Sequence, residues 1–256
     1  MPAPLVLCYH ALSADWPAAL STTPERFRRQ LELLVERGYR GVTFTDAVAG
    51  DARGERVVAV TFDDAFRSVL ELGRPILDEL GIPATVFVPT DFIDRDGPLR
   101  WPGIDQWLDG PYEHELAHLT WDELRELADA GWEIGAHTGS HPRLTQLDDD
   151  ALASELTRSK QACERRLGRP CTSMAYPYGD VDARVVAATR AAGYRTAAAL
   201  PCRLDGEDPL EWPRVGIYRS DDERRFRLKV SPLVARARRS RAWSIVDGAR
   251  RRLQQR

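Results

Sequence analysis

Two histidines four residues apart, His137 and His141, stand in the stretch GWEIGAHTGSHPRL and could bind one metal ion together. A spacing of four places two side chains on one face of a helix. However, Gly139 lies between them and Pro142 follows directly, and both residues oppose a continuous helix. We therefore expect a turn after a strand to present the pair. The alternative is that they are surface residues, or core residues whose rings bond to backbone carbonyls.

Two neighbouring carboxylates, Asp63 and Asp64, follow the apolar run VVAVTF. Burying both side by side is costly, because like charges raise the pKa of one of them, and a bound cation would remove that cost. The simpler interpretation is a helix N-cap followed by an acidic first turn. Two imidazoles and one carboxylate leave open positions for water and substrate, which is typical of a catalytic metal site.

The segments that would position these residues alternate between strand and helix patterns. Apolar or β-branched runs predict strands, and apolar residues at helical spacing between capping signals predict helices. The predicted strands cover residues 5–9, 57–62, 84–88, 132–137, 172–177, 194–200 and 213–218. The predicted helices cover residues 21–39, 68–81, 120–131, 148–168 and 181–193. This alternation indicates an α/β protein with a parallel sheet, either open or closed into a barrel.

Polar or ring-bearing residues stand at the ends of four of these strands. His10 follows the first strand, the two aspartates follow the second, the two histidines end another, and YPYG follows SMA near residue 176. The carboxyl ends of parallel strands meet at one edge, which is where such folds place their sites. We therefore expect these residues to converge on a single site.

Residues 91–118, called here the lid segment, have no clear hydrophobic period and are rich in Pro, Gly and Trp. Long irregular segments inside compact α/β domains are usually functional or disordered. With Trp101 and Trp107, the segment resembles a lid over the site more than a linker.

The composition is that of an ordinary enzyme-sized globular protein, with 256 residues, 29% charged and 43% hydrophobic. Four scattered cysteines without a CxxC pair argue against a disulfide framework and a thiolate metal site. No apolar run reaches the ~18 residues of a membrane span, and we find no signal-peptide pattern. The expected location is therefore the cytoplasm. No glycine-rich phosphate loop follows a strand, so nucleotide-binding folds lose support.

Residues 221–256 are predicted to form a basic, amphipathic C-terminal extension. From Arg224 to Arg256 basic residues interleave with apolar ones, and Asp247 is the single acid. One interpretation is a solvated helix packed across the barrel; the other is contact with an anionic membrane surface or an acidic polymer. Nucleic acid is not expected as a partner, because no recognition module is present and the remaining chain is acidic.

The motifs TFDD, HTGSH and YPYG, in this order and spacing, resemble the polysaccharide deacetylase family of carbohydrate esterases. The resemblance covers roughly residues 4–218, and the first two motifs together are specific. It implies a distorted (β/α)7 barrel over residues 1–220. It also implies metal-dependent hydrolysis of an N-acetyl or O-acetyl group on a sugar or glycoconjugate.

In that family scheme Asp64, His137 and His141 bind a divalent metal, and Asp63 is the general base on metal-bound water. Zinc is expected first, although cobalt, nickel and manganese suit the same donors. The resemblance gives the backbone N–H of Tyr178 the role of oxyanion donor. Side chains expected to touch the substrate are Tyr176, Pro177, Trp101 and Trp107.

The sequence departs from the family pattern in two places. Many members have an arginine that orients the base where this chain has Ala175, and Arg214 could supply that charge instead. Many members also have a late histidine that protonates the leaving amine, whereas no histidine follows His141. His10, His114 and His118 are candidates for this acid, and we favour His10. A structural His10, bonded to backbone, is the alternative.

Other functions stay open at this point. A related barrel could cleave another C–N bond, such as that of a cyclic imide or a ureide. The missing arginine and late histidine would also suit a catalytically weakened carbohydrate-binding homologue. A two-histidine, one-carboxylate iron oxygenase shares the ligand set, but the helix-rich pattern contradicts its usual β fold. If the protein is cytoplasmic, its substrate would be a precursor such as a nucleotide- or lipid-linked sugar.

Overall fold

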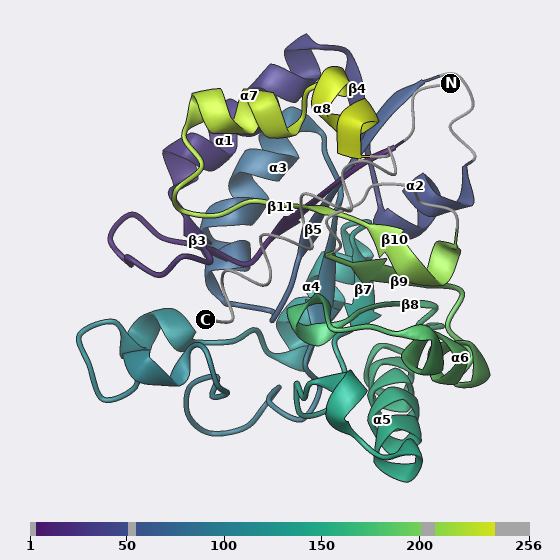
Figure 1. Cartoon of the computed structure of the whole chain (residues 1–256). Helices are drawn as coiled ribbons and strands as arrows, with labels where there is room; N and C mark the ends of the chain where they lie inside the picture. The colour runs from purple at the N-terminus through teal and green to yellow at the C-terminus, as the bar shows by residue number, and fades with distance from the viewer. Residues whose placement is uncertain (1–3, 51–54, 201–207, 239–256) are drawn as a thin grey trace, which may run out of the picture.

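The computed structural model describes residues 4–50, 55–200 and 208–238. Its main sheet is parallel and runs in the order β10-β9-β8-β7-β6-β5-β1-β11, with β4 paired to β5 outside that path (Figure 1). The strands on the path are β1 (Leu5–Tyr9), β5 (Arg56–Phe62), β6 (Ala84–Val88), β7 (Glu133–Ala136), β8 (Ser173–Ala175), β9 (Thr196–Ala199), β10 (Trp212–Pro213) and β11 (Val215–Gly216).

The sheet closes on itself through the short segment 212–216. β10 and β11 stand at the two ends of the strand order, where β10 pairs with β9 and β11 pairs with β1. Only Arg214 separates β10 from β11, so the two form one interrupted strand. With the other six strands of the path this gives seven, and the predicted distorted (β/α)7 barrel is confirmed.

The distortion of the barrel is visible along β5, whose two halves have different neighbours on one side. β4 (Tyr39–Val42) pairs with residues 56–59, and β6 then pairs with residues 60–62. The sequence prediction missed β4, because it contains no apolar run. Its Gly41 allows a close approach, since a Cβ there would lie 2.7 Å from a methyl carbon of Ile82.

Helices surround the barrel much as their capping signals predicted. Thr23 caps α1 (Pro24–Glu36), and Thr120 and Glu123 form a capping box at α4 (Trp121–Asp129). Pro75 lies in the first turn of its helix, directly after a π-helical turn, as expected for an entry proline. The remaining helices of the layer are α3 (Arg74–Leu80), α5 (Asp149–Leu167) and α6 (Ala183–Ala191).

Side-chain alternation along β5 decides which residues reach the site. Val58, Val60 and Phe62 pack into the larger core cluster with the helices, whereas Val57 and Ala59 pack into a separate small cluster. That small cluster also takes alternate residues of other strands, such as Val6, Phe87, Ala175 and Ala198, and so fills the barrel interior. Alternation continued past Ala59 places Thr61 and then Asp63 on the interior face at the carboxyl end.

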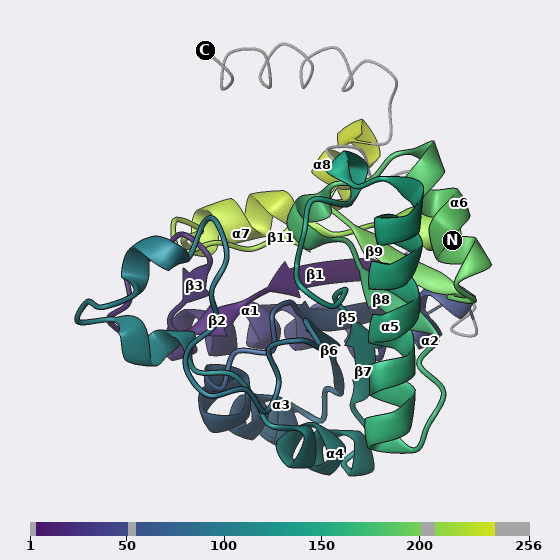
Figure 2. The same ribbon diagram turned by 90° about the horizontal axis from the view of Figure 1, so that it is seen from below.

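The lid segment is folded and has an apolar cluster of its own. It runs beside β2 (Ala11–Leu12) and β3 (Ser21–Thr22), as Figure 2 shows. Trp16 and Phe66 of the barrel loops pack with Leu99 and Leu116 of the segment in this cluster. Backbone hydrogen bonds from Arg67 to Ala117 and from Leu119 to Ala65 join the segment to the loop that follows β5.

The first part of the predicted C-terminal extension packs on the barrel. α7 (Glu223–Lys229) lies against α1, and its Phe226 is fully buried in the main core. Short helix α8 (Pro232–Arg238) follows, and Leu228 and Leu233 are exposed. Residues 239–256 lie outside the described residues, so contact with an anionic surface stays a prediction. No helix in the described ranges is long and apolar enough to cross a membrane.

Candidate metal centre and active site

Asp64, His137 and His141 come together in a buried cluster at the carboxyl ends of β5 and β7. The Asp64 Oδ1 atom lies 3.4 Å from Nε2 of His137 and 3.2 Å from Nε2 of His141. All three ligand atoms lie within 4.8 Å of one another, and the three residues are buried. Asp64 Oδ1 nevertheless forms no hydrogen bond of good geometry with any described residue. The three donors therefore point at a shared centre, which fits a small divalent cation.

The charge states of Asp64 and His141 suit a cation. Burial opposes the ionisation of Asp64, but the adjacent imidazoles lower its pKa well below the usual range of a carboxyl. Burial also lowers the pKa of His141, which favours its neutral ring, whereas the adjacent carboxylates of Asp63 and Asp64 raise the pKa of His137 against the effect of burial. An ionised carboxylate and a neutral imidazole are the forms that bind metals.

The strand β7 and the loop after it present the two histidines, as predicted. β7 ends at Ala136, and Nδ1 of His137 lies 2.8 Å from the carbonyl oxygen of Ala175, which turns Nε2 toward Asp64. The backbone N–H of His141 donates to Oγ1 of Thr138 at 3.1 Å. Thr138 and His141 adopt φ values of 65° and 59°, so the loop is not helical. The four-residue spacing is coincidental.

Backbone strain is concentrated at this site. The described residues include seven non-glycine residues with positive φ, and five of them lie here: Asp64, Ala65, Thr138, His141 and Tyr178. Such conformations cost on the order of 1–3 kcal/mol each and persist where the surrounding structure enforces them. Holding these side chains in place therefore lowers the free energy of unfolding of the protein.

Asp63 forms a two-pronged ion pair with Arg214, the residue that interrupts the last barrel strand. Arg214 Nη1 donates to Asp63 Oδ1 at 2.6 Å and Nη2 donates to Oδ2 at 2.8 Å, and both side chains are buried. Thr61 accepts a further bond from Nη1 at 3.0 Å. Burial would raise the pKa of Asp63, but Arg214 and then His137 lower it to about 2. The positive charge that the sequence lacks at position 175 thus reaches Asp63 from Arg214.

His10 lies beside this ion pair. Ligand-type atoms of Cys8, His10 and Asp63 lie within 4.8 Å of one another, and Nδ1 of His10 is buried without a partner among the described residues. These three residues do not suit a second cation, because Arg214 already occupies both oxygens of Asp63 and would repel it. His10 therefore faces the site with a free ring nitrogen.

The two other histidines proposed as acids lie elsewhere. Both ring nitrogens of His118 lie within hydrogen-bond distance of backbone carbonyls, those of Leu119 and Arg95. The side chain of His114 is 72% exposed, beside Glu115. Of the three candidates, only His10 lies next to Asp63.

The YPYG motif contributes Tyr178 but not Tyr176. The ring of Tyr178 packs edge-on against His141, with ring centroids 4.7 Å apart. Gly179 and Asp180 donate the two hydrogen bonds of the turn, and the Tyr178 N–H takes part in neither. Tyr176 is fully buried, and its hydroxyl donates to the carbonyl of Leu210 at 2.7 Å. Its side chain follows an inward-facing Ala175 and so points outward, which does not support the expected contact with substrate.

Of the two lid tryptophans, one contacts the site and the other packs away from it. Trp101 stacks on the His141 ring, with centroids 4.2 Å apart and the ring planes 25° apart. Trp107 instead packs against Trp16 and Tyr112 within the apolar cluster of the lid. Of the two tryptophans, Trp101 is the one that contacts a proposed metal ligand. Pro177 is buried beside Tyr178.

Sequence reasoning missed two residues of this site. No sequence motif marks Cys8, whose Sγ lies 3.5 Å from Oδ2 of Asp63. Glu155 of α5 accepts hydrogen bonds from the loop that carries the histidines. A signal for Glu155 was available, because it falls on the buried face of an amphipathic helix, between Leu152 and Leu156.

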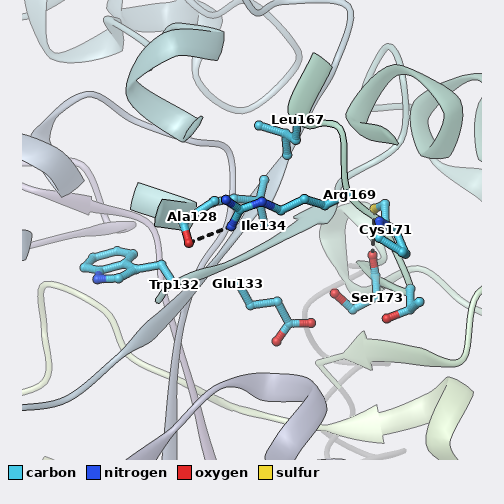
Figure 3. Close-up of a pocket in the computed structure, with 10 residues that line it drawn as sticks. Ala128, Trp132, Glu133, Ile134, Leu167, Arg169, Cys171 and Ser173 are labelled. Carbon is cyan, nitrogen blue, oxygen red and sulfur yellow. Dashed lines mark hydrogen bonds between the residues drawn. The ribbon is translucent and has the colours of Figure 1, made fainter. Parts of the chain in front are cut away.

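A different cavity, of about 160 Å³, lies at the opposite end of β7 and β8 (Figure 3). It is lined by Trp132, Glu133, Arg169, Cys171 and Ser173, among others. Arg169 donates to the carbonyl of Ala128 at 2.8 Å. None of the predicted site residues lines this cavity.

Comparison with known proteins points to one family. A family model described as polysaccharide deacetylase matches residues 50–197. YxkH of Bacillus subtilis, a relative named for this same family, is 26% identical over 194 residues, covering 74% of this chain and 62% of that protein. A poly-beta-1,6-N-acetyl-D-glucosamine N-deacetylase of Staphylococcus aureus is 23% identical over 171 residues, covering 62% of this chain and 54% of the relative.

Solved structures support the fold. The Streptococcus pyogenes deacetylase PplD, in complex with acetate, superposes with a TM-score of 0.73 at 22% identity, covering 89% of this chain and 98% of that one. IcaB from Ammonifex degensii gives a TM-score of 0.69 at 24% identity, covering 93% and 97%. The chain spans less than two thirds of the length of the two sequence relatives above.

Proposed function

Because this chain belongs to the polysaccharide deacetylase family, we propose that it is a metal-dependent hydrolase that removes acetyl groups from an N-acetylated or O-acetylated sugar. The observation that carries the proposal is the placement of the Asp64, His137 and His141 cluster directly beside the Asp63–Arg214 pair. A bound divalent ion, zinc or else cobalt, nickel or manganese, would lower the pKa of a water molecule and polarise the acyl oxygen.

Asp63 is suited to accept the proton of the attacking water. Its low pKa keeps it ionised at neutral pH, and Arg214 fixes the plane of its carboxylate. Arg214 acts through Asp63 and is thus a positioning residue. The Tyr178 N–H, which is left out of the turn hydrogen bonds, is suited to donate to the oxyanion of the tetrahedral intermediate.

The leaving amine needs a proton when the C–N bond breaks, and His10 is the proposed donor. Its imidazolium form would give one proton to the amine nitrogen while Asp63 holds the proton from water. The products are acetate and a free amino sugar. Trp101 and Tyr178, which flank His141, would form the aromatic wall for the sugar ring.

The test is acetate release from N-acetylglucosamine oligomers and acetylated glycolipids, with zinc or cobalt added, for the wild type and Asp63→Asn. We expect Asp63→Asn to keep its metal and to lose about 10²–10⁴-fold in turnover, the range for a general base. Unchanged turnover would remove Asp63 as the base. Metal binding without turnover on any acylated sugar would favour the carbohydrate-binding alternative, and turnover of a cyclic imide or ureide instead would favour the amidohydrolase.

A further inference from the structure

Glu155 binds the backbone of the loop that carries the two histidines. Its Oε2 accepts the N–H groups of Gly139 at 2.8 Å and Ser140 at 2.9 Å. Its Oε1 accepts the Ser140 hydroxyl at 2.9 Å. The side chain reaches the loop from α5 and is only 9% exposed. One carboxylate thus binds the two residues midway between His137 and His141.

Residues that follow β6 also bind this loop. The Thr90 N–H donates to the carbonyl of Thr138 at 3.1 Å, and the Asp91 N–H donates to the carbonyl of Gly139 at 3.0 Å. The loop is therefore bound through its carbonyls by Thr90 and Asp91, and through its N–H groups by Glu155.

An arginine joins Asp91 to Glu155. Arg158 lies 3.1 Å from Oδ2 of Asp91 and 3.4 Å from Oε1 of Glu155. Gly139 packs against all three side chains, because a Cβ at that position would lie 3.0 Å from Arg158 and 3.1 Å from both carboxylates. Any side chain at 139 would displace this group.

The loop needs such support because its conformation is strained. Thr138 and His141 both have positive φ, and no glycine relieves either position. Without Glu155 the buried Gly139 N–H would have no partner, and the loop would relax toward ordinary φ values. Relaxation would move the His141 ring relative to Asp64.

We propose that Glu155 is a positioning residue that fixes the loop 137–141 and thereby sets the affinity and geometry of the metal site. The inference rests on the proposed metal-dependent function. It differs from a purely structural role for a buried carboxylate, which would change stability and leave metal binding alone.

The experiment uses the full chain stripped of metal and titrated with zinc against a chelating dye. We expect Glu155→Ala to weaken zinc binding about 10–100-fold, the range for loss of an outer partner of a metal ligand. Glu155→Gln should restore much of the affinity, because its amide oxygen can still accept the two N–H groups. The cobalt form of Glu155→Ala should have an altered visible spectrum, which reports the ligand geometry.

The matched control is Glu164→Ala on the same helix. Glu164 also bonds a lysine and a loop N–H, those of Lys160 and Cys171, but it does not contact the loop 137–141. We expect it to lower the thermal midpoint while zinc affinity and the cobalt spectrum stay at wild-type values. Ser140→Ala removes one of the three bonds at an exposed residue, and so tests the idea even if Glu155→Ala fails to fold. It should weaken zinc binding a few-fold.

Wild-type zinc affinity in Glu155→Ala, or in Ser140→Ala if Glu155→Ala does not fold, would overturn the inference and leave the proposed function intact. A wild-type chain that binds neither zinc nor cobalt would overturn the proposed metal site itself, and the role of Glu155 with it. Equal loss of affinity in the Glu164→Ala control would also overturn it, since a general loss of stability would then explain the effect.

Discussion

A carboxylate at each end of the barrel, the half-buried Glu133 and the buried Asp64, is hydrogen-bonded in an opposite way. At the amino end, Oε2 of Glu133 accepts the Thr45 N–H at 2.9 Å and the Thr85 hydroxyl at 3.1 Å, and its Oε1 accepts the Thr45 hydroxyl. At the carboxyl end, Asp64 Oδ1 and Nδ1 of both His10 and His141 have no hydrogen-bond partner among the described residues.

The backbones of the two ends differ in the same sense. The five strained residues gather at the carboxyl end, whereas none of the seven positive-φ residues of the described ranges lies near Glu133. The helix α2 (Phe44–Ala49) packs Phe44 into the barrel interior and brings Thr45 to Glu133. One end is thus arranged for stability. The amino end has one unpartnered hydroxyl, that of Ser173, whereas the carboxyl end leaves a carboxylate oxygen and two imidazole nitrogens unpartnered among the described residues, which fits a site that binds a ligand.

Removing a proposed metal ligand should have the largest effect at the carboxyl end. We expect Asp64→Ala to lower zinc affinity by more than the roughly 10–100-fold that outer partners contribute, and to reduce acetate release to the background rate. Its stability should fall little, or even rise, because a buried carboxylate is removed. Metal content and unfolding in urea measure both effects. A variant that keeps both metal and turnover would contradict the ligand assignment.

Breaking the Asp63–Arg214 pair should harm stability and activity together. Arg214→Met leaves a buried charge without a partner, which costs about 3–5 kcal/mol in the free energy of unfolding. Because Arg214 depresses the pKa of Asp63, the pair stabilises the fold above the usual carboxyl range, and that stability is lost as pH falls toward about 2.

Arg214→Lys gives the more informative rate measurement, because it keeps a charge and loses the two-pronged contact. We expect the pKa of Asp63 to rise, so the acid limb of the pH–rate profile should move to higher pH. A profile that falls in amplitude without moving would indicate a structural role for Arg214 only.

Changing His10 should separate proton donation from metal binding. We expect His10→Ala to lower amide turnover by at least about 10²-fold, with zinc affinity near the wild-type value. Hydrolysis of 4-nitrophenyl acetate should suffer less, because its leaving group needs no proton. His118→Ala is the control, and equal losses in both variants, or equal losses on both substrates, would remove His10 as the acid.

The smallest effect on activity is expected at the amino end. Glu133→Ala leaves the N–H and hydroxyl of Thr45 and the hydroxyl of Thr85 without their acceptor, so the free energy of unfolding should fall by about 1–3 kcal/mol. Turnover by the folded fraction should not change. A loss of turnover larger than the loss of folded protein would show that the two ends are coupled.

The sequence predicted those parts of the molecule that depend on local pattern. The run ATVFV became β6 with the predicted bounds, and Gly139 with Pro142 correctly indicated a loop for the histidines. The convergence of residues at strand ends followed from the rule that parallel strands share one carboxyl edge, and it placed Asp64 beside both histidines.

What the sequence did not predict depends on distant partners. β4 is a strand because β5 pairs with it. Glu155 accepts hydrogen bonds from Gly139 and Ser140, which precede it by 16 and 15 residues, and this contact depends on how α5 packs against the loop. The outward direction of Tyr176 follows from alternation after Ala175, a pattern that is already present in the sequence. Asp63 and Arg214 are 151 residues apart in the sequence, and only the closed barrel brings them into contact. Their two-pronged ion pair could therefore not be read from local pattern.

The interruption of the last barrel strand at Arg214 has a consequence for how the protein is made. During synthesis the two aspartates and both histidines leave the ribosome long before Arg214 does. Until residues 212–216 dock between β9 and β1, Asp63 lacks its counter-ion. If Asp64, His137 and His141 are the metal ligands and Asp63 is the base, as we propose, the ligand residues are made before the base can be aligned. We then expect hydrolytic competence to be gained only when the barrel closes.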